Sequence, residues 1–272
     1  MSDPLPIGVF DSGVGGLTVL RALRERLPAA DFIYLGDTAR LPYGTRTAET
    51  VERYALQAAS VLVESGIAAL VVACNTASSV AVEALRAAFA PLPVFGVLEP
   101  GAEAAASVSR SGRIGVLATE STVAGGAYAR AILRRRGDAR VRMRACQLFV
   151  ALAEEGWTSG PAVEAIVERY VGGWFDGWRA PDTLLLGCTH FPVLASALRT
   201  RCPRDVELVD SASTTAELVA RTLTGQSGAG SLRLLATDGV DRFARVGSRF
   251  LGQGIRAAEV ELVDLPQVPF GA

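Results

Sequence analysis

The sequence contains no lysine, one histidine (His190) and one asparagine (Asn75), so all 27 of its basic residues are arginine. The missing lysine excludes pyridoxal phosphate chemistry, because that cofactor forms a Schiff base with a lysine amine. Any chemistry at an amino-acid Cα must proceed without it, and the sequence predicts no cofactor. The lone histidine and the lone asparagine each lie beside a cysteine, in "GCTHF" and "ACNTAS".

Charge and hydropathy exclude two classes of partner. The 27 basic and 28 acidic residues give a net charge of −1, which does not suggest a nucleic-acid partner. No apolar run reaches the roughly 20 residues that span a bilayer, so no membrane partner is expected. The N-terminal "MSDPLPIGVF" lacks the basic segment of a secretory signal, and we expect a cytoplasmic protein.

The chain has only four cysteines: Cys74, Cys146, Cys188 and Cys202. Four in 272 residues do not form a disulfide scaffold, and no Cys-x-x-Cys pair occurs. One histidine and four scattered cysteines show no zinc-ligand spacing, so no metal is expected. Cys146 and Cys202 have no polar companions, and we interpret both as structural.

Short apolar runs alternate with amphipathic stretches, which indicates an α/β fold. Runs such as "ALVVA" and "TLLL" are typical of parallel strands covered on both faces. We predict strands at residues 7–10, 32–35, 69–73, 94–97, 114–117, 142–147, 183–186 and 207–209. We predict helices at residues 17–27, 50–64, 161–170 and 214–223, and a further strand and helix in the tail.

A weak internal repeat divides the chain. "IGVFDSG" begins at Ile7 and "IGVLATE" at Ile114, and each is followed by a strand that ends in a cysteine, Cys74 or Cys188. We predict two similar, doubly wound parallel-sheet domains related by pseudo-twofold symmetry. The first comprises residues 1–98 and 213–272 and the second residues 99–212, with the active site in the cleft between them.

The two cysteines suggest a specific reaction. Ligands bind beyond the carboxyl ends of strands in open α/β sheets, and "DSGVGG" follows the first strand in the same way. Two facing domains would place one thiol on each side of a substrate, as inversion of a stereocentre requires. One thiolate would take the Cα proton and the other thiol would return one. Asp11 could assist one thiol and His190 the other, while Asn75, Thr76 and Thr189 offer donors.

Taken singly, each feature has a simpler interpretation. A cysteine at a strand end is most often a small buried apolar residue, and a glycine-rich turn is often only a turn. Five motifs in order are more specific: "IGVFDSGVGGLTVL", "YLGDTARLPYG", "VVACNTASS", "VFGVLEP" and "LLLGCTHFPVL". Together they resemble the aspartate/glutamate racemase superfamily, in particular its cofactor-independent glutamate racemases, from Ile7 to about Ala212.

The resemblance implies racemisation of L- and D-glutamate by two cysteines, supplying D-glutamate for peptidoglycan. Cys74 would act on D-glutamate and Cys188 on L-glutamate, and a homodimer is possible. The catalytic residues that it implies are Cys74, Cys188, Asp11, His190 and Glu154, the last in "ACQLFVALAE". The implied substrate-binding residues are Asp11, Ser12, Tyr43, Gly44, Asn75, Thr76, Thr119, Thr189 and His190.

The sequence departs from the family pattern near two of these residues. Gln147 and Ala151 replace the usual prolines before Glu154, and Gly125 stands where a serine is common. Two other functions stay open. Aspartate racemases usually carry an acid where this chain has His190, so the residue favours glutamate. A non-catalytic or redox module with exposed thiols would need neither Asp11 nor His190.

Overall fold

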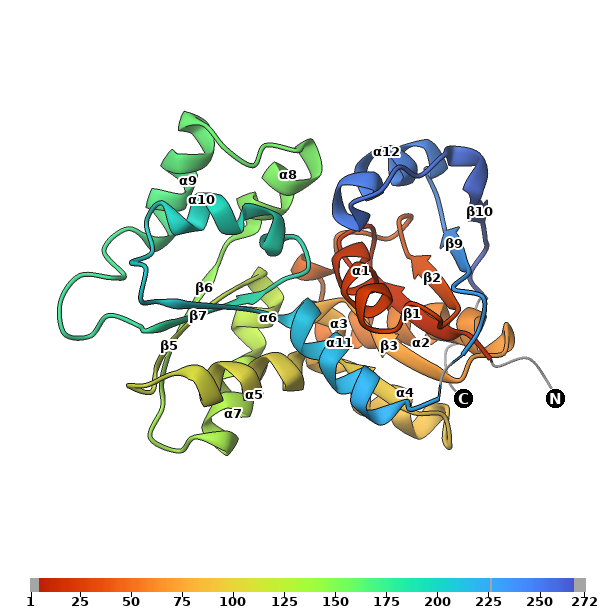
Figure 1. Ribbon diagram of the computed structural model, residues 1–272, viewed down its shortest axis with the longest axis horizontal. Coiled ribbons are helices and arrows are strands. Elements are labelled where there is room, and N and C mark those ends of the chain that lie inside the picture. Colours follow the sequence, from red (N-terminus) through yellow and green to blue (C-terminus); the bar gives the residue numbers. More distant parts are fainter. Residues whose placement is uncertain (1–4, 226, 267–272) are drawn as a thin grey trace.

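The computed structural model describes residues 5–225 and 227–266, which form two lobes, each built around a parallel sheet (Figure 1). From edge to edge, the first sheet contains β10 (Val260–Leu262), β9 (Leu232–Ala236), β2 (Phe32–Gly36), β1 (Ile7–Asp11), β3 (Ala69–Val72) and β4 (Val94–Gly96). The second contains β6 (Arg140–Ala145), β5 (Arg113–Ala118), β7 (Thr183–Gly187) and β8 (Glu207–Asp210). The predicted α/β class is confirmed.

Helices connect the strands and cover the sheets (Figure 1). Those of the first lobe are α1 (Leu17–Arg26), α2 (Ala48–Glu64), α3 (Asn75–Val80), α4 (Val82–Ala88), α11 (Ser211–Thr222) and α12 (Val240–Leu251). Those of the second are α5 (Leu98–Val108), α6 (Glu120–Gly125), α7 (Ala127–Arg135), α8 (Gln147–Glu155), α9 (Pro161–Val171) and α10 (Ala195–Arg199). None of these helices is long and apolar enough to span a membrane.

The two sheets share one strand order. In the first, β1 lies between β2 and β3, followed by β4; in the second, β5 lies between β6 and β7, followed by β8. The chain thus reverses direction across each sheet beside β1 and beside β5, and ligands bind beyond the strand ends at such switch points. This shared order supports the internal repeat predicted from the sequence.

Apolar side chains alternate between the two faces of each sheet. In β3, Val71 packs into the cluster with α1, α11 and α12, whereas Leu70 and Val72 join the cluster with α2, α3 and α4. In β7, Leu184 and Leu186 face α8 to α10, and Leu185 faces α5 and α7. Burial on both faces accounts for the continuous apolar runs that predicted these strands.

One strand prediction was misplaced. The strand expected at residues 142–147 is Arg140–Ala145, and Cys146 and Gln147 begin α8 instead. β6 is an edge strand, and its alternating arginine and apolar residues reflect one solvated face. The helix predicted at residues 214–223 starts earlier, because the Asp210 side chain accepts hydrogen bonds from the Ala212 and Ser213 amides, both at 2.9 Å.

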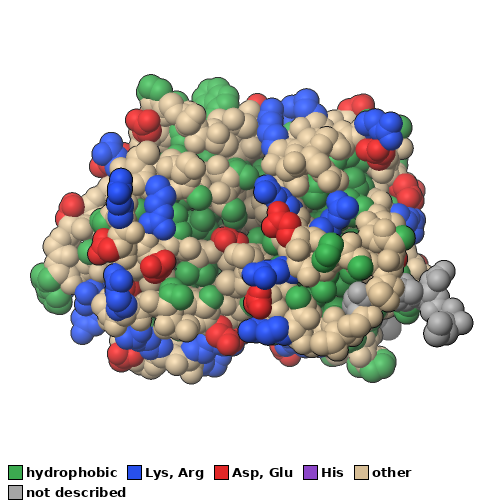
Figure 2. Space-filling model, viewed as in Figure 1, with side chains coloured by type: hydrophobic (Ala, Val, Ile, Leu, Met, Phe, Trp, Pro, Cys, Tyr) green, Lys and Arg blue, Asp and Glu red, His purple; other side chains and the backbone are tan. Residues whose placement is uncertain are grey.

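The tail returns to the first lobe. β9 pairs with β2 in parallel, and β10 pairs with β9, so this sheet draws on both ends of the chain. The exact domain boundaries, at residues 98 and 212, stay a prediction. On the face shown in Figure 2, acidic and basic side chains are intermixed, without a large patch of one sign.

Candidate active site

The carboxyl ends of β1, β3 and β7 meet around a cavity of about 50 Å³ between the lobes. Its lining consists of Ser12, Gly13, Leu41, Pro42, Tyr43, Gly44, Cys74, Asn75, Thr76, Thr119, Gln147, Val150, Glu154, Cys188, Thr189 and His190. Every predicted site residue except Asp11 is in this lining. A larger cavity of about 400 Å³ shares Thr76 with it but contains neither cysteine.

Cys74 occupies the N-cap of α3. Its Sγ accepts a hydrogen bond from the Ala77 amide at 3.4 Å and donates one to Ser12 Oγ at 3.4 Å. Burial and the nearby Asp11 carboxylate raise the pKa of Cys74 to about 12. In the structure as it stands, this sulfur is therefore a thiol, ready to give a proton rather than take one.

Asp11 lies just outside the cavity lining, at the end of β1. Its side chain is buried, with Oδ2 accepting from the Gly13 amide at 3.0 Å and no protein partner for Oδ1. Burial raises the pKa of this carboxyl, although the charge on His190 and neighbouring amides oppose the shift. A buried carboxyl with one free oxygen can hold or pass on a proton.

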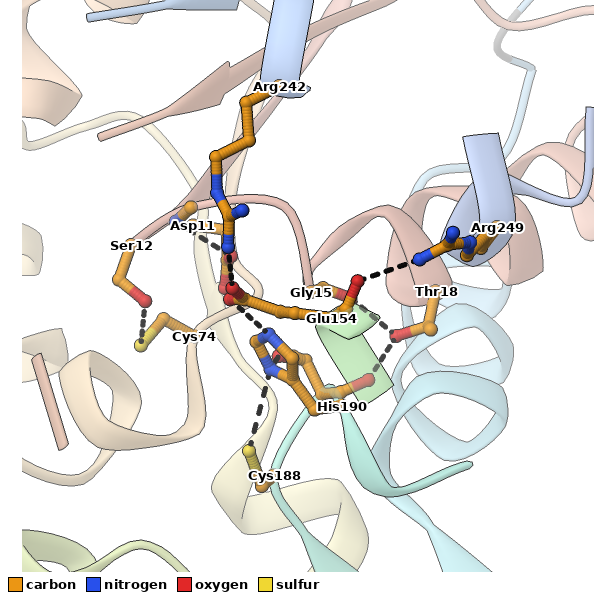
Figure 3. A network of polar contacts seen from close by, with 12 residues as sticks. Asp11, Ser12, Gly15, Thr18, Cys74, Glu154, Cys188, His190, Arg242 and Arg249 are labelled. Carbon is orange, nitrogen blue, oxygen red and sulfur yellow. Dashed lines mark hydrogen bonds and ion pairs between the residues drawn. The ribbon is translucent and has the colours of Figure 1, made fainter. Parts of the chain in front are cut away.

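Cys188 follows β7 and heads a chain of polar contacts. Its Sγ lies 3.8 Å from His190 Nδ1, and His190 Nε2 lies 3.2 Å from Glu154 Oε1 (Figure 3). Burial lowers the pKa of His190, but the contacts with Cys188 and Glu154 outweigh it and raise the pKa to about 10. The ring is therefore an imidazolium at neutral pH, and its charge stabilises negative charge on the neighbouring sulfur.

Two glycines allow the lobes to approach closely. A Cβ on Gly15 would lie 2.4 Å from the His190 ring and 2.4 Å from Thr189 Oγ1. A Cβ on Gly44 would lie 2.7 Å from Thr119 Cβ. Larger residues at these positions would force the two halves of the site apart, so the glycines of "DSGVGG" and "PYG" set its width.

Three threonine hydroxyls contact one another on one side of the cavity. The Oγ1 atoms of Thr76 and Thr119 are 3.0 Å apart, and Thr122 Oγ1 is 3.3 Å from the first and 3.0 Å from the second. Sequence reasoning missed Thr122, which is buried behind the two threonines of the lining. In the sequence, only its position in "TEST", three residues after Thr119, indicates that Thr122 lies near the site.

Asn75 is held by two residues that the sequence also did not reveal. Its Nδ2 lies 2.7 Å from Tyr128 OH and 3.0 Å from Ser211 Oγ, while Oδ1 has no protein partner. The two ends of an amide are assigned from their hydrogen bonds. With the amide reversed, both hydroxyls would donate to Oδ1 and the Nδ2 donors would be left for a ligand.

Tyr43 is anchored from behind the cavity. The buried Asp37 carboxylate accepts hydrogen bonds from Tyr43 OH, from Arg40 Nε at 2.7 Å and from Thr237 Oγ1 at 3.0 Å. Asp37 therefore lies outside the lining of the cavity. It fixes the short 3₁₀ turn Tyr43–Thr45, which brings Tyr43 and Gly44 to the cavity.

Residues 7–219 match the family model described as Asp/Glu/Hydantoin racemase. The chain belongs to this family. A glutamate racemase from Geobacter metallireducens is 50% identical over 252 residues, covering 90% of this chain and 92% of the relative. The resemblance to this superfamily found in the sequence is confirmed.

Solved structures give the same result. The glutamate racemase of Thermus thermophilus, in complex with β-chloro-D-alanine, has a TM-score of 0.86 at 42% identity, covering 97% of this chain and 99% of its own. The Francisella tularensis enzyme, in complex with D-glutamate, has a TM-score of 0.87 at 32% identity, covering 97% of this chain and 98% of its own. The fold of this racemase family therefore extends over nearly the whole chain.

Proposed function

We propose that the chain interconverts L-glutamate and D-glutamate, with Cys74 and Cys188 as acid and base on opposite sides of Cα. From L-glutamate, the Cys188 thiolate takes the Cα proton and the Cys74 thiol gives a proton to the other face. From D-glutamate the two roles exchange. No electron is transferred, and each turnover moves one proton onto one sulfur and another off its partner.

The observation that carries this proposal is the contrast between the two sulfurs. Both line one cavity, but they come from different lobes. Cys74 lies near the Asp11 carboxyl and is a thiol, whereas Cys188 lies beside the His190 imidazolium. The two sulfurs therefore have different electrostatic surroundings, a carboxyl near one and an imidazolium beside the other, and this contrast supports giving them the opposite roles of acid and base.

The polar lining is suited to a dicarboxylate with an ammonium group. Ser12, Thr76, Thr119 and Thr189 present hydroxyls, and a reversed Asn75 amide presents N–H donors to a carboxylate. The absence of lysine from the sequence removes the Schiff-base route, so the thiols must act directly on the amino acid. Glutamate is proposed because the relatives that cover the chain are glutamate racemases, and one was solved with D-glutamate.

The proposal is tested by incubating purified protein with L-glutamate and, separately, with L-aspartate, without pyridoxal phosphate, and following optical rotation. We expect the rotation of glutamate to fall to zero and that of aspartate to stay constant. Loss of rotation with aspartate alone would instead identify an aspartate racemase. Constant rotation with both substrates would favour a non-catalytic thiol protein.

The product has a clear use: D-glutamate is consumed in peptidoglycan synthesis, the role that the family resemblance implies. We place the enzyme in the cytoplasm, where thiols stay reduced, because all four cysteines are free and the reaction needs two of them. We also propose a homodimer. Leu148, in the first turn of α8, and Trp157, just after the end of α8, are more than half exposed and are available to contact a second copy.

A further inference from the structure

Helix α12 places three side chains around the pair formed by Glu154 and His190. Arg242 Nη2 donates to Glu154 Oε2 at 2.6 Å, and Arg249 Nη1 donates to the Glu154 backbone oxygen at 2.7 Å (Figure 3). The Phe250 ring meets the His190 ring edge-on, with centroids 5.0 Å apart. The tail of the chain, far from both cysteines in sequence, therefore borders the reacting groups.

The contacts cross from one lobe to the other. In the sequence, α12 connects β9 to β10 of the first sheet, whereas Glu154 is in the last turn of α8 in the second lobe. Arg242 and Arg249 are seven residues apart, about two helical turns, so they lie on one face of α12. This face is the one turned toward Glu154 in Figure 3.

Arg249 binds the C-terminal end of α8. The last carbonyls of a helix lack partners within the helix, and the Glu154 carbonyl is one of them. α8 stops at Gly156, which has φ of 75°, and a Cβ there would lie 2.7 Å from Arg249 Cζ. Glycine at this position thus leaves room for the guanidinium, which binds the free carbonyl and complements the helix dipole.

Arg242 secures the carboxylate itself. Oε1 of Glu154 contacts His190 Nε2, and Oε2 contacts Arg242, so each oxygen has a cationic partner. The Glu154 side chain is only 16% exposed, and burial alone would raise its pKa. His190 and Arg242 outweigh burial and hold the pKa below its usual range, which keeps Glu154 an anion.

We propose that Arg242 is a positioning residue for proton transfer at Cys188, a role that rests on the two-thiol function proposed above. It holds the Glu154 carboxylate against His190 Nε2, so that Nδ1 stays directed at Cys188 Sγ. The hydrogen bonds of the Cys74 sulfur are to Ser12 and Ala77 and involve no residue of α12. Loss of Arg242 therefore impairs one of the two proton transfers.

The test is the Cα deuterium isotope effect of Arg242→Gln in both directions. The equilibrium constant between enantiomers is one, so kcat/KM must fall equally for L- and D-glutamate, by up to about 10²-fold. The isotope effect on kcat/KM should rise with deuterated L-glutamate, because the Cys188 step becomes more limiting. It should fall with deuterated D-glutamate, whose deuterium is taken by Cys74.

Two variants serve as references. Arg245→Gln removes the same charge from α12, and within residues 5–225 and 227–266 Arg245 has no ion pair or side-chain hydrogen bond, so it should keep wild-type kinetics. Arg242→Lys retains a cation and should recover part of the lost rate. In a Glu154→Gln background, Arg242→Gln should cost nothing further, because Arg242 acts through Glu154.

Unchanged isotope effects in Arg242→Gln would overturn the positioning role, as would a full additional loss in the Glu154→Gln background. Equal changes in the isotope effects for L-glutamate and for D-glutamate would also overturn it, since they indicate a general structural defect. Failure of the proposed function is a separate outcome. It would appear as a wild-type protein that does not racemise glutamate, or as full activity in Cys188→Ala.

Discussion

At the scale of single residues, the two sulfurs that we propose to react differ in their neighbours. Cys74 is buried near a carboxyl group, and Cys188 lies 3.8 Å from an imidazole nitrogen that carries a proton at neutral pH. The two side chains are chemically identical, but a carboxyl lies near one sulfur and an imidazolium beside the other. A two-base racemase needs this difference, because one sulfur must be a thiolate when the other is a thiol.

The first prediction concerns the four cysteines. Cys74→Ala and Cys188→Ala should each abolish racemisation, because one face of Cα would lose its only acid or base. The circular dichroism of glutamate measures the racemisation. Cys146→Ala and Cys202→Ala are matched controls: both sulfurs are buried outside the cavity. These two should keep their activity and lose about 1 kcal/mol of stability. Full activity in either of the first pair would exclude the mechanism.

The second prediction concerns stability and pH. The pKa of His190 is about 10 in the folded protein and near 6.5 in an unfolded chain, so the folded state binds the extra proton between these values. The contribution of His190 to the free energy of unfolding should therefore fall as pH rises, by up to about 1.4 kcal/mol per unit. Between pH 6.5 and 7.5, where most thiols of the unfolded chain, with a pKa of about 8.5, are still protonated, His190→Asn should remove this slope.

Urea unfolding at several pH values measures the slope directly. The raised pKa means that the stabilisation is complete below pH 6.5 and is lost as pH approaches 10. Because His190 is the only histidine, no other imidazole contributes in this range. A slope of the same size in wild type and His190→Asn would show that the ring is not held as an imidazolium.

At the scale of elements, the site depends on how tightly the turns after β1 and β7 approach. Gly15 faces His190 and Thr189 at a distance that admits no Cβ, and Thr18 Oγ1 lies 3.0 Å from the Thr189 carbonyl. The turn after β1 thus fixes the position of the turn that carries Cys188. This contact joins segments separated by more than 170 residues.

The third prediction is that Gly15→Ala lowers activity without unfolding the protein. The added methyl would displace the His190 ring and the Cys188 turn, and misplacement by about 1 Å can cost about 10²-fold in rate. Gly125→Ala is a suitable control, because a Cβ there would meet no atom within 4 Å. Racemisation rates and thermal unfolding of both variants test it. A Gly15→Ala enzyme with wild-type rates would show that this approach does not limit the site.

Sequence and structure agree best where one segment determines its own role. The apolar strands followed at once by "CNTAS" and "CTHFP" predicted both sulfurs at strand ends, because parallel strands place such turns at one edge. The start of α8 is harder to predict from the sequence. β6 is an edge strand with an alternating pattern, and Cys146 fits that pattern as well as it fits the start of the helix.

Contacts between distant segments could not be predicted from the pattern. Arg242 and Glu154 are 88 residues apart, and Asn75 and Ser211 are 136 apart. Whether such residues meet depends on how the two lobes pack, and no local period in the sequence encodes that packing. The sequence of α12 predicts only a helix in the tail.

At the scale of the whole molecule, neither lobe holds a complete site. The first supplies Cys74 and Asp11, the second supplies Cys188, His190 and Glu154, and α12 of the first lobe reaches across to Glu154. Because the lobes share one strand order, each presents its sulfur at an equivalent strand end. A repeated architecture therefore provides two opposed bases for a reaction whose two directions are mirror images.

Hydrogen exchange with solvent shows whether separate groups serve the two faces of Cα. L-glutamate is incubated with the enzyme in heavy water, and both enantiomers are separated and analysed by mass spectrometry at early times. We expect one deuterium at Cα of the D-glutamate formed, delivered by Cys74, and almost none in the remaining L-glutamate. Equal labelling of both pools from the start would indicate a single exchanging base and would contradict the proposed mechanism.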